Sequence, residues 1–221
     1  MRYTIVTPTI CRQSLVRLCE SIDSQTQVDW EHLVVVDMPR KNMTADKRKV
    51  IAAIPPQAKR SFSYCDKKHN NYGHTCRHQI WEHAKGDYIL YVDDDDYLAD
   101  KDVLRTLDSV TEPWAVFPAL RNGDAFFHLP PGIGRTGTGM FLHRKDIGRW
   151  PDLDSYEADG SFVEELRQKY PYQVLNSRPL VVQPKSSCGV PNAETWLGGK
   201  LAKLVARWLW YRYSGKISTV L

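Results

Sequence analysis

The chain has 221 residues, which is enough for one enzyme-sized globular domain with a buried core. With 42% hydrophobic, 11% aromatic and 25% charged residues, its composition excludes disordered, collagen-like and coiled-coil proteins. Its uncharged stretches are shorter than the roughly 20 apolar residues of a membrane-spanning helix, and its first residues do not resemble a signal peptide. We therefore expect a cytoplasmic protein.

The formal net charge of +4 is concentrated near the C-terminus. Residues 197–221 hold five basic residues and no acidic residue, so residues 1–196 carry a net charge of −1. Apolar side chains share one helical face there, and Lys200, Lys203 and Arg207 share another. This pattern predicts a basic amphipathic helix over 196–221, which follows a domain of residues 1–195.

Such a helix has three possible partners. It can lie peripherally on the anionic inner face of a membrane, dock on the domain that precedes it, or dock on a second subunit. Nucleic acid is not an expected partner, because the rest of the chain has no basic stripe.

The first hundred residues alternate between strand-like and helix-like segments. Residues rich in β-branched side chains predict strands at 3–7, 32–37, 61–65 and 88–92, and apolar spacing predicts helices around 15–22, 45–54 and 75–84. This alternation predicts an α/β fold with a mostly parallel central sheet flanked by helices. The loops at 8–12, 37–44 and 93–96 should then meet at the carboxyl edge of the sheet, where ligands bind.

The pattern becomes mixed after residue 100. Strand-like segments at 114–120 and 124–129 flank Asn122-Gly123 and predict a hairpin, followed by a glycine-rich loop at 130–139. A strand at 140–144, a helix at 159–169 and short strands within 172–183 follow. Gly132–Gly137 has GxGxxG spacing but precedes a strand, so we do not assign it to dinucleotide binding. We expect this region to be either a plain flexible loop or part of the wall of a ligand pocket.

Four consecutive carboxylates, Asp93 to Asp96, follow the apolar strand at 88–92. Adjacent carboxylates repel one another in a partly desolvated site unless a cation neutralises them, and Mg²⁺ or Mn²⁺ prefers such oxygen ligands. Because Mg²⁺ leaves much of its coordination shell to substrate phosphates, the run predicts a nucleotide diphosphate ligand. A solvated acidic turn is the alternative.

Five motifs follow one another in a recognisable order: TIVTPT at 4–9, VVVD at 34–37, NNYGHTCRHQIWEHAKGDYI at 70–89, YVDDDDYL at 91–98 and EADGSFVEEL at 157–166. In this order they resemble glycosyltransferase family 2, over roughly residues 3–170. The resemblance implies the GT-A fold, a Rossmann-like nucleotide-diphospho-sugar transferase architecture. It also implies an inverting enzyme that moves a sugar from a UDP- or dTDP-sugar to a hydroxyl of a saccharide or lipid-linked acceptor.

The same resemblance gives the acidic run its roles. Asp93 and Asp95 take the two acidic positions of the DxD motif, with Asp95 as the ligand of Mn²⁺ or Mg²⁺ and Asp93 facing the ribose or sugar. Asp94, between them, belongs to the nucleotide-sugar site.

Four further residues match positions that bind the nucleotide in this family. Asp37 would contact the nucleobase, Pro8 and Thr9 would lie along the nucleoside, and Arg77 would lie near the nucleotide. The residues that follow Asp37 and Arg77 depart from the family pattern, so the preferred base and sugar are not specified. Asp37 could instead cap a helix, and Arg77 could form a structural ion pair.

Inversion at an anomeric carbon needs a base that removes the acceptor proton from the side opposite the leaving nucleotide. Alignment of 157–166 with the acidic helix motif of the family places Asp159 at its aspartate, and we predict Asp159 as this base. Asp159 could also cap the helix that follows. Two other functions stay open: a non-catalytic carbohydrate-binding protein of this fold, and a nucleotidyltransferase, although loop 8–12 lacks the glycines that hold a triphosphate.

Overall fold

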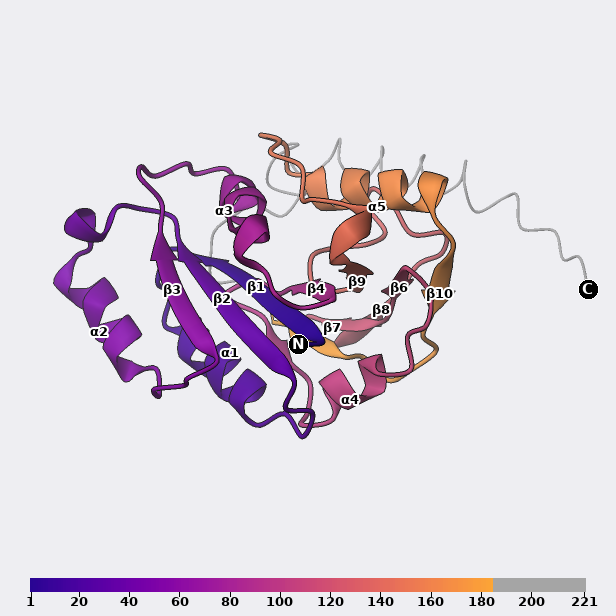
Figure 1. Ribbon diagram of the computed structural model, residues 1–221, viewed down its shortest axis with the longest axis horizontal. Coiled ribbons are helices and arrows are strands. Elements are labelled where there is room, and N and C mark those ends of the chain that lie inside the picture. The colour runs from indigo at the N-terminus through magenta and orange to yellow at the C-terminus, as the bar shows by residue number, and fades with distance from the viewer. Residues whose placement is uncertain (185–221) are drawn as a thin grey trace, which may run out of the picture. The chain divides into compact units, whose positions relative to one another are not determined.

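The computed structural model describes residues 1–184, which form a layered α/β arrangement (Figure 1). The predicted helix over 196–221 and the domain boundary at residue 195 lie outside the described residues. Among the helices of residues 1–184, none has the length and apolar character needed to cross a membrane.

The strands are β1 (Tyr3–Thr9), β2 (Trp30–Val36), β3 (Arg60–Tyr64), β4 (Tyr88–Tyr91), β5 (Tyr97–Leu98), β6 (Trp114–Val116), β7 (Ala119–Arg121), β8 (Asp124–Phe126), β9 (Phe141–Arg144), β10 (Tyr172–Val174) and β11 (Val181–Gln183). The α-helices are α1 (Ser14–Asp23), α2 (Ala45–Ala53), α3 (His74–Ile80), α4 (Val103–Leu107) and α5 (Ala158–Lys169). Short 3₁₀ helices are η1 (Arg40–Asn42), η2 (Trp81–His83) and η3 (Lys145–Ile147).

The central sheet has seven strands in the order β10-β6-β9-β4-β1-β2-β3. Strand β1 pairs in parallel with β2 on one side and with β4 on the other, and β2 pairs in parallel with β3. Strand β9 is antiparallel to both of its neighbours, β4 and β6. The mostly parallel α/β sheet predicted from the alternation is confirmed.

Successive residues of the central strands enter opposite cores. Ile5 and Leu90 pack with α1, α2 and α4 on one face, whereas Val6 and Tyr91 pack with α3 and α5 on the other. Figure 1 shows these two groups of helices on opposite sides of the strands. Burial on both faces explains why the parallel strands read as continuous apolar runs rather than as an alternating pattern.

The second half differs from the prediction in one respect. Segment 114–120 is not a single strand, because the chain leaves the central sheet after β6, at Phe117-Pro118, and enters a second sheet as β7. This second sheet has the order β5-β11-β7-β8. Proline has no N–H for a ladder hydrogen bond, which favours a break at this position. The hairpin itself is confirmed: β7 and β8 pair antiparallel across Asn122-Gly123, both at positive φ.

Candidate functional site

The loops that follow β1, β2 and β4 meet at the carboxyl edge of the central sheet. The backbone N–H of Asp37 donates to the carbonyl of Thr9 at 2.8 Å, and the Thr9 hydroxyl donates to Asp94 at 2.6 Å. The predicted convergence of the three loops is therefore confirmed. It follows from the parallel pairing, which brings the ends of β1, β2 and β4 to the same edge.

The four aspartates alternate between buried and partly exposed positions. Asp94 and Asp96 are buried, whereas the side chains of Asp93 and Asp95 are 35% and 25% exposed. A turn holds the run, since the N–H of Asp96 donates to the carbonyl of Asp93 at 3.1 Å. The burial of two of the four carboxylates excludes a fully solvated acidic turn, and Asp93 and Asp95 stay partly exposed.

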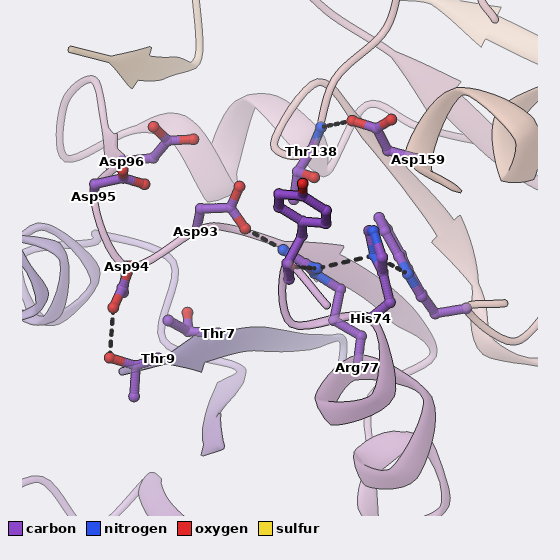
Figure 2. Close-up of polar contacts among 12 residues, drawn as sticks. Thr7, Thr9, His74, Arg77, Asp93, Asp94, Asp95, Asp96, Thr138 and Asp159 are labelled. Atoms are coloured by element: carbon purple, nitrogen blue, oxygen red, sulfur yellow. Dashed lines mark hydrogen bonds and ion pairs between the residues drawn. The ribbon is translucent and has the colours of Figure 1, made fainter. Parts of the chain in front are cut away.

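Asp94 fastens the first loop to the acidic run. It accepts a hydrogen bond from the Thr9 hydroxyl, which Figure 2 shows. It also accepts one from the Ile10 N–H at 3.3 Å and forms an ion pair with Arg12. Burial raises the pKa of Asp94, and the positive charge of Arg12 opposes that shift. With these contacts Asp94 has a structural part in the site, and its contact with a nucleotide stays a prediction.

Asp93 is held by the buried guanidinium of Arg77. Arg77 donates to Asp93 through Nη2 and to the carbonyl of Tyr72 through Nη1 at 2.8 Å, and it lies 4.6 Å from the centre of the Trp150 ring. The ion pair that sequence analysis left open for Arg77 is therefore present. Arg77 is only 1% exposed, so its guanidinium has a fixed position from which it orients Asp93. These contacts do not test its predicted position near a nucleotide.

His74 and Trp150 both contact this guanidinium and also bond to each other. The Trp150 indole N–H donates to Nδ1 of His74 at 3.1 Å, and Nε2 of His74 donates to the carbonyl of Ser155 at 2.9 Å. Burial, reinforced by the charge of Arg77, lowers the pKa of His74 to about 4, so the ring is neutral. Sequence analysis missed both residues, because they lie 76 positions apart and no local pattern indicates that they pair.

Asp159 lies in the first turn of α5 and does not cap it. Glu157 occupies the N-cap position without a side-chain cap bond, so the capping alternative for Asp159 is wrong. The Asp159 carboxylate accepts from the N–H of Thr138 at 3.1 Å and from that of Gly160 at 2.7 Å. Burial raises its pKa, the amide of Gly160 lowers it, and the negative charge of Asp93 raises it again.

Figure 2 shows the acidic run on one side of the view and Asp159 on the other, with Thr138 next to Asp159. Gln183 on β11, another residue that sequence analysis missed, connects the two sides. Its amide nitrogen donates to Asp96 at 3.1 Å and to the carbonyl of Thr138 at 2.7 Å. Neither the short strand β11 nor its parallel pairing with β7 has a local sequence signal strong enough to predict this bridge.

The acidic run is the part of the site that suits Mg²⁺ or Mn²⁺. Burial raises the pKa of Asp95, and the nearby charge of Asp93 raises it further. Burial, with the charges of Asp93 and Asp95, raises the pKa of Asp96 well above its ordinary value. A divalent cation would relieve this repulsion, and the oxygen-only donors of Asp93 and Asp95 match the preference of these two ions.

A second group of potential metal ligands surrounds Asp37. One ligand atom each from Asp37, Cys65 and His69 lies within 4.8 Å of the others. Both carboxylate oxygens of Asp37 already accept backbone hydrogen bonds, from His69 at 2.8 Å and from Asn70 at 3.0 Å. This mixed oxygen, sulfur and nitrogen set does not suit Mg²⁺. The observed role of Asp37 is to anchor the loop before α3.

Asp37 caps no helix, since Thr44 caps α2 with its hydroxyl. Pro8 packs against Gly73: a Cβ atom built on Gly73 would lie 2.5 Å from the Cβ of Pro8. The contacts of Asp37, Pro8 and Thr9 with a nucleotide remain predictions. Within the protein, these residues connect the ends of β1 and β2 with the loop that leads into α3.

The family model "Glycosyl transferase family 2" matches residues 4–151. No curated protein matches the chain significantly.

Three solved structures share the fold. Staphylococcus aureus TarS 1–349 in complex with UDP-GlcNAc is 19% identical, with a TM-score of 0.65 over 84% of this chain and 59% of that chain. A mannosyltransferase from Pyrobaculum calidifontis in complex with GDP-Man and Mn²⁺ is 15% identical, with a TM-score of 0.63 over 93% and 64%. HddC from Yersinia pseudotuberculosis is 10% identical, with a TM-score of 0.55 over 83% and 93%. The chain thus spans about three-fifths of the length of TarS 1–349.

Proposed function

Because the chain belongs to glycosyl transferase family 2, we propose that it transfers a sugar from a nucleotide-diphosphate donor to a hydroxyl group of an acceptor. Its mixed α/β architecture is the GT-A fold. The observation that carries the proposal is the alternation within the acidic run: Asp93 and Asp95 are partly exposed at the end of β4, whereas Asp94 and Asp96 are buried. An isolated acidic turn would not bury two carboxylates at such electrostatic cost.

The donor is a nucleotide-diphosphate sugar, for which we propose a UDP- or dTDP-sugar, bound with Mn²⁺ or Mg²⁺. In support, a fold neighbour at low identity holds UDP-GlcNAc, and another holds GDP-Man with Mn²⁺. Asp95 would be the principal ligand of the ion, and Asp93 would be held towards the ribose or sugar by Arg77. When bound, the ion would supply positive charge that stabilises the departing diphosphate.

The residues of the chain would perform the proton transfer of an inverting reaction. The acceptor oxygen forms a bond to the anomeric carbon while the bond from that carbon to the diphosphate breaks. The proton of the acceptor hydroxyl passes to Asp159. The raised pKa of Asp159 makes its carboxylate a better proton acceptor than an exposed aspartate, and its bonds to the Thr138 and Gly160 amides orient it.

The contacts of the first loop argue against a nucleotidyltransferase. An enzyme that binds a triphosphate needs unoccupied backbone N–H groups in this loop. Here the N–H of Ile10 donates to Asp94, and the N–H of Cys11 donates to the Thr9 hydroxyl at 2.7 Å. These groups are already used within the protein.

The test is nucleotide release by the purified full chain from a panel of UDP-, dTDP- and GDP-sugars, with a pool of saccharide acceptors, in Mn²⁺ or in EDTA. We expect release with at least one donor, dependent on Mn²⁺ and lost in Asp95→Asn. Asp46→Asn is the matched control, because Asp46 is exposed on α2 and pairs with Lys49, which is also exposed. Release that persists in EDTA and in Asp95→Asn would contradict the metal assignment.

A further inference from the structure

Two exposed tyrosine rings contact each other next to α3 and α5, the helices that carry Arg77 and Asp159. Tyr72 is 56% exposed and Tyr156 is 70% exposed, and their ring centres lie 5.5 Å apart in an edge-to-face arrangement. Tyr72 precedes α3 and Tyr156 precedes α5, so two segments far apart in the sequence meet here. Large aromatic side chains exposed as a contiguous pair are typical of binding surfaces.

The pair is directly connected to the residues proposed for the reaction. The carbonyl of Tyr72 accepts from Arg77, and the same guanidinium holds Asp93. Tyr156 lies three residues before Asp159, and the carbonyl of its neighbour Ser155 accepts from His74. The segments that carry the two rings therefore also contact or contain the residue that holds Asp93 and the proposed base.

The backbone at Tyr72 is strained, and no burial of its ring compensates for the strain. Tyr72 has φ of 57°, between Asn70 at 56° and Gly73 at 79°. The left-handed conformation is ordinary for glycine and asparagine but unfavourable for a tyrosine. Such strain is typical of positions where presentation of a side chain matters more than local stability.

The charge of the segment that carries Tyr156 restricts what the pair can bind. Residues 152–159 contain Asp152, Asp154, Glu157 and Asp159 and no basic residue. This segment repels anionic lipid headgroups, phosphorylated polymers and acidic glycans. A sugar ring presents C–H groups that pack on the negative face of an aromatic ring, and its hydroxyl groups donate to carboxylates.

We propose that Tyr72 and Tyr156 form a binding platform for the acceptor, and that this acceptor is a neutral or amino-bearing saccharide. The inference rests on the proposed function, because it assigns the acceptor side of that site. Such a platform would bind a saccharide acceptor rather than an acceptor that is recognised through a lipid or an anionic group.

The test is the binding of the full chain, with UDP and Mn²⁺, to an array of neutral, amino-bearing and anionic oligosaccharides. Tyr72→Asn removes the ring while retaining a residue that accepts positive φ, and Tyr156→Ala removes the second ring. We expect binding to neutral or amino-bearing glycans, weakened about tenfold for each ring removed. Tyr72→Phe and Tyr156→Phe, which retain the rings, should bind as the wild type does.

Three results would overturn the platform: equal binding by the ring-deleted variants, preference for anionic glycans, or binding to none of the array. Calorimetric titration of the same samples with UDP and Mn²⁺ separates this outcome from failure of the proposed function. Intact nucleotide binding with ring-independent glycan binding refutes only the platform. Loss of nucleotide binding in the wild type refutes the donor site itself.

Discussion

The proposed donor side and the proposed acceptor side of the candidate site are built differently. On the donor side, Thr9, Asp37 and Asp94 lie at the ends of paired strands, are buried, and form hydrogen bonds with one another or with neighbouring loops. On the acceptor side, Tyr156 is exposed, and Asp159 is oriented by two backbone amides. The sheet register positions the first side, whereas a small number of loop contacts position the second. Substitutions on the two sides should therefore affect different quantities.

The largest expected effect is on the rate. Asp159→Asn should lower kcat by about 10²–10⁴-fold, because asparagine cannot accept the acceptor proton. Nucleotide affinity should not change, since Asp159 is on the proposed acceptor side. Steady-state kinetics and calorimetric titration with UDP and Mn²⁺ measure the two quantities. Glu165→Gln, at an exposed position further along α5, is the control and should retain turnover; an Asp159→Asn variant that turns over normally would remove the base assignment.

The next effect is on stability and donor binding. Arg77→Met removes the buried cation that holds Asp93 and that packs on Trp150. We expect a loss of about 3 kcal/mol in the free energy of unfolding, together with a higher KM for the donor. Chemical denaturation measures the loss. Arg144→Met, which breaks the exposed pair with Asp146, should lower the free energy of unfolding by at most about 1 kcal/mol. Equal losses for the two variants would show that the Arg77–Asp93 pair stabilises the protein no more than an exposed pair does.

A smaller effect should arise where the donor loops join. Gly73→Ala forces alanine into φ of 79° and places its Cβ 2.5 Å from the Cβ of Pro8. Gly134→Ala is a matched control, since it has φ of 69° with no atom within 4 Å of the added Cβ. The control should cost about 1–2 kcal/mol from backbone strain alone. Gly73→Ala should cost more, and equal melting temperatures would contradict the close packing of Pro8 on Gly73.

The smallest effect is on the pH profile. Burial and the charge of Asp93 raise the pKa of Asp159, while the Gly160 amide and Arg77 oppose the shift. The active base is the ionised form, so kcat/KM should fall about tenfold per unit as the pH decreases below this pKa. The acid limb should therefore lie above the ordinary aspartate pKa of about 3.9. A limb at or below that value would indicate that Asp159 is not the titrating base.

Much of the donor side could be predicted from the sequence. Parallel strands have a fixed direction, so residues that end β1, β2 and β4 had to meet at one edge, and the apolar run before Asp93 marked its strand. What the sequence could not predict is which of the aspartates are buried. Their alternation follows from the turn between Asp93 and Asp96, which no local pattern specifies.

The contacts that support and connect the two sides were less predictable, for a physical reason. The pairing of His74 with Trp150, and the bridge from Gln183 to Thr138, join residues that are many positions apart through loops and short strands. Such contacts arise from tertiary packing and leave no periodic signal. The prediction of a single strand over 114–120 was wrong for the same reason, since only the three-dimensional arrangement assigns β6 and β7 to different sheets.

The most direct test of the central claim is calorimetric titration of the full chain with UDP, dTDP and GDP, each with and without Mn²⁺. We predict that at least one of the three binds and that Mn²⁺ strengthens its binding at least about tenfold, which is a coupling free energy of about 1.4 kcal/mol. Asp95→Asn should abolish this dependence on Mn²⁺. Binding of equal strength in Mn²⁺ and in EDTA, or the same Mn²⁺ dependence in Asp95→Asn, would contradict it.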